Sequence, residues 1–280
     1  MKTKLTVLCE NSVYVPFPLI GEHGFSCLIE GEDATLFDTG QGLGIMNNMK
    51  VLGKDPSAIR RIILSHGHYD HTGGLLHVLK SRDGKTEVHL HPSGFKAKVA
   101  HIPTGGDPIE VPIGMRATRD EYEAAGAEFI NISGYQPITG GIHALSEVKR
   151  PKGWTTWDTR LKQKEGDKAI SDPFDDDVSL LIETDSGPVV LLGCAHAGIV
   201  EILNDLAERS GHKEFHAVIG GTHLETAPEE YVKKAMETLR AYKVKKIAVS
   251  HCTGFARAAQ FATEFPESFA TASTGAVFEF

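Results

Sequence analysis

The sequence has few cysteines and no long apolar run. Its four cysteines, Cys9, Cys27, Cys194 and Cys252, are far apart and form no CxxC pair, which favours reduced thiols over a disulfide scaffold. The N-terminal apolar run is too short for a secretory signal, and no run approaches the roughly 20 apolar residues that cross a bilayer. We therefore expect a cytoplasmic protein that does not enter a membrane.

An excess of positive charge is also absent, because the formal net charge is −8. Binding to nucleic acid through counterion release is therefore not expected. A chain of 280 residues, 41% of them hydrophobic, can bury a large core in one domain or in two closely merged halves. We expect one domain over residues 1–280 and a small-molecule partner; the sequence does not predict the oligomeric state.

Short apolar runs rich in Val, Ile and Phe occur at both ends of the chain and are typical of strands. The expected strands are residues 4–9, 25–30, 34–38, 60–65, 87–90, 178–183, 188–193, 216–219 and 245–250. The expected helices are residues 72–80, 93–100, 118–125, 198–209, 228–242 and 255–264. Because strands and helices alternate, the pattern predicts a layered α/β architecture.

The middle of the chain differs in composition from both ends. Residues 101–177 are rich in Pro, Gly and charge, with few long apolar runs. A helix is expected within this segment because Thr118 and Glu121 fit a capping box and Gly126 fits a stop signal. We interpret the segment as an insertion that caps the core and shapes a substrate pocket.

The stretch SHGHYDHTGG, residues 65–74, contains three histidines and an aspartate: His66, His68, Asp70 and His71. These side chains would repel or desolvate one another if simply buried, whereas a divalent cation would satisfy all of them. Nitrogen and oxygen donors suit zinc, and also iron or manganese. The alternative is a polar loop whose histidines cap the next helix.

This pattern resembles the HxHxDH signature of the metallo-β-lactamase-fold hydrolases, supported by LFDTG at residues 36–40. The resemblance implies an α/β fold of the four-layer αββα sandwich type, with one or two metal ions at one edge of the two sheets. It also implies that Asp38 stabilises the metal loop without binding metal. The alternative for Asp38 is an ordinary turn aspartate.

Two later strands end in histidine. His196 follows the strand in VVLLGCAHAG, and His251 follows the strand in KIAVSHCTG; we expect both to be metal ligands. The family resemblance would place a bridging aspartate after Gly193, where this chain has Cys194, and a histidine near residues 175–177, which are acidic. Either His196 fills the gap, or the carboxylates do, or a second metal is weakly held.

A further histidine, His223 in IGGTHLE, also follows a strand. We expect it to act in catalysis or binding; the alternative is a hydrogen-bonded histidine at a sheet edge. The segments GCAHAGI, GGTHLE and SHCTG narrow the resemblance to a subgroup labelled 7,8-dihydropterin-6-yl-methyl-4-(β-D-ribofuranosyl)aminobenzene 5'-phosphate synthase.

Cationic residues and both tryptophans gather in residues 149–168. Lys152, Trp154 and Trp157 are therefore expected to bind an anionic substrate with a flat ring, such as a phosphorylated pterin. The alternative is a solvated loop with two unrelated tryptophans.

The expected activity is that of a metal-dependent hydrolase with a metal-activated water. Asp70 would ligate metal and orient the water, and Cys194 or Cys252 would adjust the metal surroundings. Alternatives are a dihydropterin-type synthase on the same metal site and a non-catalytic binding protein stapled by metal, whose site would be closed to solvent.

Overall fold

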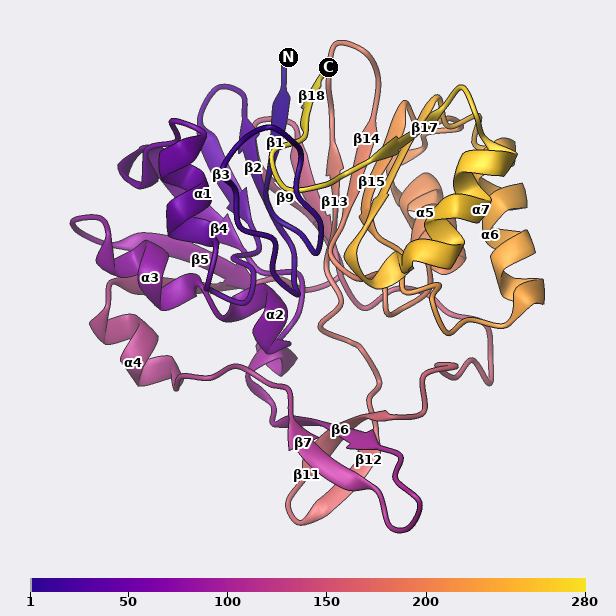
Figure 1. Ribbon diagram of the computed structural model, residues 1–280, viewed down its shortest axis with the longest axis horizontal. Coiled ribbons are helices and arrows are strands. Elements are labelled where there is room, and N and C mark those ends of the chain that lie inside the picture. Colours follow the sequence, from indigo (N-terminus) through magenta and orange to yellow (C-terminus); the bar gives the residue numbers. More distant parts are fainter. Residues whose placement is uncertain (1) are drawn as a thin grey trace.

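Two seven-stranded sheets pack face to face in the computed structural model, which describes residues 2–280 (Figure 1). The first sheet has the order β18 (Val277–Glu279), β1 (Lys4–Cys9), β2 (Ser26–Glu30), β3 (Ala34–Phe37), β4 (Ile59–Ile63), β5 (Thr86–Leu90) and β8 (Ala127–Asn131). The second has the order β17 (Phe269–Thr271), β16 (Lys246–Ser250), β15 (Ala217–Gly221), β14 (Val189–Leu192), β13 (Ser179–Ile182), β10 (Ile142–Leu145) and β9 (Tyr135–Thr139).

Helices cover the outer face of each sheet (Figure 1). Those of the first half are α1 (Ile45–Val51), α3 (Leu75–Lys80) and α4 (Arg119–Ala124), while the short helix α2 (Tyr69–Thr72) lies at the edge of the sheet where the strands end. Those of the second half are α5 (Ile199–Ser210), α6 (Glu229–Ala241) and α7 (Phe255–Glu264). The described residues also form three 3₁₀ turns: η1 (Pro56–Ala58), η2 (Pro92–Phe95) and η3 (His251–Thr253). The predicted α/β sandwich is confirmed.

The core is continuous between the two sheets. Leu5, Phe37 and Ile63 of the first sheet share one buried cluster with Leu180 and Ile219 of the second. Both faces of the central strands are covered, so these strands appear in the sequence as unbroken apolar runs. Burial of this apolar surface holds the two halves in a fixed relation.

Parallel pairing brings several strand ends to one edge of the molecule. β3, β4 and β5 run parallel in the first sheet, and β14, β15 and β16 run parallel in the second. The carboxyl ends of parallel strands share an edge, and in open α/β sheets this edge is where ligands bind. The loops that leave these ends carry the polar motifs of the sequence.

The helix expected at 72–80 begins later, at Leu75, as α3, and Gly73 and Gly74 separate it from the short helix α2. A Cβ atom on Gly73 would lie 2.2 Å from the Gln41 carbonyl oxygen, and one on Gly74 would lie 2.2 Å from the Thr39 carbonyl oxygen. Only glycine allows this close approach. These two glycines therefore allow the loop that carries the HxHxDH motif to pack against the loop after β3.

The helix predicted at 93–100 is wrong. Pro92 begins the single turn η2, and the chain then enters the strand β6 (Lys98–Ile102). β6 lies between β11 (Leu161–Glu165) and β7 (Ile109–Pro112) in a separate sheet that also contains β12 (Lys168–Ser171). Pairing with distant strands, which a local pattern does not contain, decides the structure of this segment.

Only part of the insertion predicted at about 101–177 lies outside the two main sheets. The small sheet of β6, β7, β11 and β12 extends beyond them (Figure 1), but β8, β9 and β10 are main-sheet strands. β8 and β9 are edge strands in which only Ala127 is buried, which gave them a weak apolar signal. The capping box at Thr118 is confirmed and begins α4.

Candidate metal centre

The first donor cluster consists of His66, His68 and His196. The Nε2 atom of His66 lies 2.9 Å from Nδ1 of His68 and 3.2 Å from Nε2 of His196. The first two residues follow β4, and the third follows β14. All three side chains are buried, so both halves of the chain contribute to one group of imidazole donors.

The second donor cluster consists of Asp70, His71, His251 and His23. Oδ2 of Asp70 lies 3.2 Å from Nε2 of His251, 3.3 Å from Nε2 of His23 and 3.6 Å from Nε2 of His71. The Nε2 atoms of His71 and His251 are 3.4 Å apart. The two clusters are adjacent, because the rings of His66 and His71 have centroids 4.3 Å apart.

The spacing of the donors fits metal coordination. Bonds of about 2.1 Å place neighbouring nitrogen ligands roughly 2.9–3.4 Å apart, depending on whether the geometry is octahedral or tetrahedral. The separations in both clusters fall in or next to this range. Nδ1 is the ring nitrogen that His68 brings to this cluster, and its Nε2 is buried without a hydrogen-bond partner.

The protonation of the first cluster also fits a metal. Burial lowers the pKa of His66 and His196 well below the usual value, and that of His68 to about 3. These imidazoles are therefore neutral at pH 7, as metal ligands must be. In the second cluster burial favours a protonated Asp70, but His71 and His251 outweigh it and lower the pKa of that carboxyl below its usual range.

Surrounding residues orient the ligands. Asp38 accepts hydrogen bonds from the backbone N–H and hydroxyl of Ser65, both at 2.7 Å, and lies 2.7 Å from Nδ1 of His71. Burial lowers the pKa of His71, but Asp38 and Asp70 outweigh it and raise the pKa to about 9. The surroundings of His71 thus favour positive charge, which a cation at its Nε2 would supply. Asp38 has the loop-stabilising position that the family resemblance implied.

The acidic residues near 175–177 hold loops in place. Oδ2 of Asp176 accepts a hydrogen bond of 2.9 Å from the backbone N–H of Gly67, and Oδ2 of Asp177 accepts one of 2.7 Å from that of Ala197. His196 is the residue that joins the first cluster, and the ring of Phe174 stacks on it at 4.5 Å. Of the three alternatives left open by the sequence, the geometry favours His196 as the third nitrogen donor.

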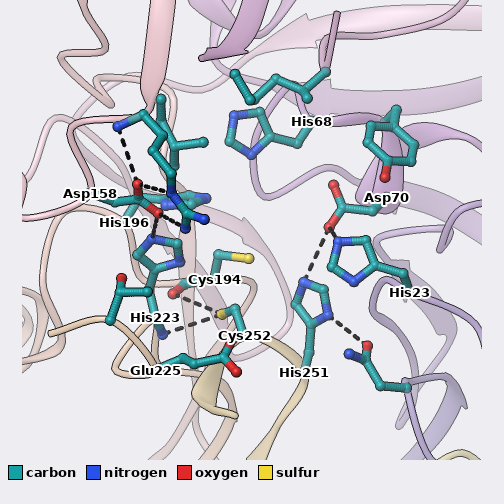
Figure 2. Close-up of a pocket in the computed structure, with 17 residues that line it drawn as sticks. His23, His68, Asp70, Asp158, Cys194, His196, His223, Glu225, His251 and Cys252 are labelled. Carbon is teal, nitrogen blue, oxygen red and sulfur yellow. Dashed lines mark hydrogen bonds and ion pairs between the residues drawn. The ribbon is translucent and has the colours of Figure 1, made fainter. Parts of the chain in front are cut away.

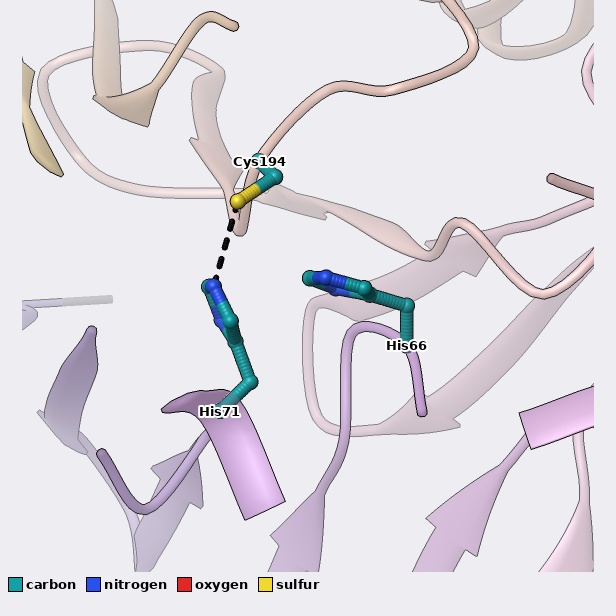
Figure 3. Close-up of side chains that lie close together, drawn as sticks. All are labelled: His66, His71 and Cys194. Carbon is teal, nitrogen blue, oxygen red and sulfur yellow. Dashed lines mark hydrogen bonds between the residues drawn. The ribbon is translucent and has the colours of Figure 1, made fainter. Parts of the chain in front are cut away.

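The two cysteines beside the expected ligands differ in position. Sγ of Cys194 lies 3.1 Å from Nε2 of His71 and points into the space between His71 and His66 (Figure 3). Sγ of Cys252 instead accepts a hydrogen bond of 3.2 Å from the backbone N–H of His223. Only Cys194 therefore points between the donor clusters.

A cavity of about 300 Å³ opens next to the donors. Figure 2 shows Asp70, His23 and His251 on one side of this pocket and Asp158 and His223 on the other. The small sheet contributes to the wall, and its strand β11 begins at Leu161 in the lining. The donors thus face a space large enough for a small molecule.

Across the pocket from Asp70, the buried carboxylate of Asp158 holds two cationic groups. It forms a two-point ion pair with Arg160 at 2.8 and 2.7 Å, and its Oδ2 lies 3.3 Å from Nε2 of His223. Burial lowers the pKa of His223, but the nearby Asp158 carboxylate and Cys252 outweigh it and raise the pKa to about 9. The surroundings of His223 thus favour its protonated form, and its ring lies 4.3 Å from that of His196.

The predicted substrate-binding residues lie in different places. Lys152 is exposed, Trp154 packs under the guanidinium of Arg150 at 4.7 Å, and neither lines the pocket. Trp157 donates a hydrogen bond of 3.2 Å to the carbonyl of His223 and supports the pocket wall from behind. Arg160 is the cationic residue of the 149–168 segment that lines the pocket. The chain reaches the edge of the sheets that carries the donor clusters only where it enters β11.

Sequence reasoning missed His23, Asn11, Asp158 and Arg160. His23 and Asn11 lie in the loops between β1 and β2, where Oδ1 of Asn11 is 2.8 Å from Nδ1 of His251. No repeated spacing connects these residues with the HxHxDH motif. The one available signal was a pair of opposite charges two positions apart, Asp158 and Arg160, close to the tryptophans. The direction in which these two side chains point depends on the tertiary structure.

No helix among residues 2–280 is long and apolar enough to span a membrane.

Comparison with known proteins agrees with this geometry. The model of the metallo-beta-lactamase superfamily matches residues 20–251. The chain is 31% identical to the 7,8-dihydropterin-6-methyl-4-(beta-D-ribofuranosyl)-aminobenzene-5'-phosphate synthase of Methanocaldococcus jannaschii, over 99% of this chain and 96% of that protein.

Solved structures show the same relationship. Tm1679, a metal-dependent hydrolase of the beta-lactamase superfamily, matches with a TM-score of 0.84 and 27% identity over 99% of both chains. The metallo-beta-lactamase fold protein YhfI from Bacillus subtilis matches with a TM-score of 0.59 and 14% identity over 100% of both chains, and this second likeness concerns the fold alone.

Proposed function

Because the chain belongs to the metallo-beta-lactamase superfamily, we propose that it is an enzyme that hydrolyses a small anionic substrate at a divalent-metal centre. The observation that carries this proposal is the convergence of two donor clusters on one side of a cavity. His66, His68 and His196 would hold one ion, and Asp70, His71 and His251 would hold another.

We propose zinc as the metal, with iron or manganese as alternatives, since the donors are mainly imidazole nitrogens. When bound, the metal lowers the pKa of water and stabilises negative charge that develops on the substrate. The protein supplies the remaining functions. Asp38 fixes the ring of His71, Asn11 fixes the ring of His251, and Asp70 accepts a hydrogen bond from the reacting water.

His223 is proposed to act as a general acid. Asp158 holds its imidazole in the protonated form on the pocket wall opposite Asp70, where it can donate a proton to a leaving group. Arg160, oriented by the same carboxylate, offers a fixed cation for a phosphate or carboxylate of the substrate. This arrangement supports the proposal of an anionic substrate; a phosphorylated or pterin-like compound is the class we propose.

A synthase is the second candidate, and the nearly full-length match to a named dihydropterin synthase favours it. The product in that protein's name joins a dihydropterin group to a phosphorylated ribosyl-aminobenzene group. The same metal centre and the same cations could bind the phosphate of either partner. A non-catalytic, metal-stapled protein is not favoured, because structural zinc sites are closed and these donors line a cavity.

Product analysis with isotopic water separates the two candidates. Protein loaded with zinc is incubated in ¹⁸O-enriched water with phosphodiesters, lactones, thioesters, pterin phosphates and a pair of pterin and aminobenzene substrates. Hydrolysis places one ¹⁸O atom in the product, whereas a synthase joins the two substrates without this label. His196→Ala protein is the control, and turnover equal to that of the wild type in this variant would contradict the proposed site.

A further inference from the structure

A second cavity lies beside the metal loop, in the first half of the chain. Its volume is about 590 Å³, and none of the residues that line it also lines the pocket beside the donor clusters. Leu90 at the end of β5 and Asn131 at the end of β8 are part of its lining. β5 and β8 run parallel to β4, so the second cavity lies at the same edge of the first sheet as the HxHxDH loop, where ligands bind in open α/β sheets.

Two segments that pack on the HxHxDH loop form the walls of the second cavity. They are residues 92–97 and 114–119. A Cβ atom on Gly67 of the loop would lie 2.0 Å from the carbonyl oxygen of Gly94 in the first wall. The backbone N–H of Tyr69 donates a hydrogen bond of 2.9 Å to the carbonyl of Ile113, next to the second wall. Both walls are therefore fixed to the core, as is usual for a preformed ligand site.

Apolar and cationic side chains line the second cavity. The apolar residues are Leu90, Pro92, Phe95, Met115 and Ala117, and the cationic residues are Lys96, Arg116 and Arg119. No aspartate or glutamate is among the described residues of the lining, although the whole chain has 37 acidic and 29 basic residues. Three positive charges without a negative one, in a chain of net charge −8, favour an anionic ligand at this place.

Aromatic rings orient the two arginines of the second cavity. The guanidinium of Arg116 lies 4.6 Å from the ring centroid of Tyr69, and that of Arg119 lies 5.3 Å from the ring centroid of Phe129. Arg119 also pairs with the exposed Glu123 at 2.7 Å, whereas Arg116 pairs with no carboxylate of residues 2–280. A ring orients a guanidinium without neutralising it, so Arg116 keeps its charge and its N–H donors for a ligand.

We propose that the second cavity is a binding site for a small anion with an aromatic body, such as an aryl phosphate. The planar guanidinium groups of Arg116 and Arg119 match phosphate oxygens with paired N–H donors. Phe95 and Met115 offer apolar contacts to the ring of the ligand. The site shares no residue with the pocket beside the donor clusters and therefore does not depend on the proposed activity.

Calorimetric titration with 1-naphthylmethylphosphonate tests this site, because the compound has the charge and ring of an aryl phosphate but cannot be hydrolysed. We expect it to bind to the zinc-loaded and to the metal-free protein. Arg116→Gln and Arg119→Gln should each weaken binding about tenfold or more in both forms, since a charge-assisted hydrogen bond is lost. The uncharged 1-naphthylmethanol should bind more weakly by a similar factor. Binding that requires zinc, or equal affinity in the wild type and Arg116→Gln, overturns the second site.

Two further arginines are controls for this titration. The guanidinium of Arg240 lies 4.8 Å from the ring centroid of Phe265 and pairs with Glu264 at 2.6 Å, which matches the surroundings of Arg119, but it lies on α6. Arg240→Gln should keep the affinity of the wild type, and so should Arg160→Gln in the metal-free protein. Loss of binding in Arg240→Gln would mean a nonspecific effect of charge, and loss in Arg160→Gln alone would place the probe in the pocket beside the donor clusters. Either result overturns the second site.

Chemical modification of the wild type covers the case in which the variants fail to fold. Phenylglyoxal, which reacts with accessible guanidinium groups, is added with and without 1-naphthylmethylphosphonate, and the modified positions are mapped by mass spectrometry of peptides. We expect the phosphonate to protect Arg116 and Arg119 but not Arg240. Equal modification of Arg116 in both samples overturns the second site. Protection of Arg160 alone overturns it as well, while it leaves the proposed function intact.

Discussion

At the scale of single residues, the site is built on strained backbone. Asp38, Ala195, His223 and His251 have φ values of 58°, 55°, 49° and 50°, in the left-handed region that side chains other than glycine rarely adopt. Each of them lies within three residues after the end of a strand, in a loop that carries metal or pocket residues. Such conformations persist where the surrounding structure determines them, and they cluster at functional sites.

Asp38 allows a test of ligand orientation without a change in backbone strain. Asparagine tolerates the left-handed region about as well as aspartate, so Asp38→Asn removes the charge beside His71 and keeps the fold. We expect metal affinity to fall roughly 10–100-fold, measured by competition with a chromophoric chelator. The exposed Asp55 serves as the control, and equal affinity in Asp38→Asn and Asp55→Asn would contradict the role of Asp38.

Arg160 and Lys152 distinguish a pocket cation from a surface cation. Arg160 lines the pocket and Lys152 does not. We expect Arg160→Ala to raise KM for an anionic substrate by about tenfold or more, because a charge-assisted hydrogen bond is lost. Lys152→Ala should leave KM unchanged. Steady-state kinetics of the two variants give both KM values. A larger rise in KM for Lys152→Ala than for Arg160→Ala would favour the expectation from the sequence that Lys152 binds the substrate.

At the scale of elements, one buried lysine ties the small sheet to the metal loop. Lys98 of β6 is 1% exposed, and its ammonium lies 2.7 Å from Asp172 and 2.8 Å from Asp176. Asp176 in turn accepts the hydrogen bond from Gly67, the residue between His66 and His68. A buried carboxylate with two partners thus connects a strand of the small sheet to the HxH segment.

Removal of the Lys98 ammonium leaves two carboxylates buried without their cation. We expect Lys98→Met to lower the free energy of unfolding by roughly 3–5 kcal/mol, measured by urea denaturation of metal-free protein. The exposed Lys96, two positions earlier, is the matched control, and Lys96→Met should change stability by less than about 0.5 kcal/mol.

The double variant Lys98→Met with Asp172→Asn refines this test. Neutralising Asp172 removes one of the two unpaired charges, so the double variant should recover part of the lost stability. If Lys98→Met alone is as stable as Lys96→Met, the buried ion pairs do not hold the small sheet to the core.

At the scale of the whole molecule, the metal centre joins the two halves. One set of ligands follows β4 in the first sheet and the other follows β14 and β16 in the second, so a bound ion bridges the sandwich. Zinc at about 100 times its Kd should add about 2.7 kcal/mol to the free energy of unfolding. For a chain of this size we expect the Tm to rise by roughly 5 °C.

Magnesium is the control for this thermal measurement, because it prefers oxygen ligands and would find few in these clusters. Addition of a chelator to the zinc-loaded protein should return the Tm to the metal-free value. An equal rise in Tm with both cations would mean that the bound ion is not held by the imidazoles.

Local patterns predicted most of the fold and the principal ligands. The apolar runs of the central strands were clear because both faces of these strands are buried, and the HxHxDH motif places four donors within six positions of the sequence. The edge strands β8 and β9 were not predicted because they bury little apolar surface. The helix expected at 93–100 failed because β6 exists only through pairing with β7 and β11.

The sequence by itself therefore determined the layered α/β fold, the family resemblance and the set of strand-end donors, since these depend on short-range periodicity and spacing. Only the tertiary structure decided that His196 joins His66 and His68, that Cys194 points between the clusters, and that Arg160 rather than Lys152 reaches the pocket. The physical reason is that these contacts join strand ends more than a hundred positions apart, or depend on which way a loop turns. Both are set by sheet packing, which no local pattern encodes.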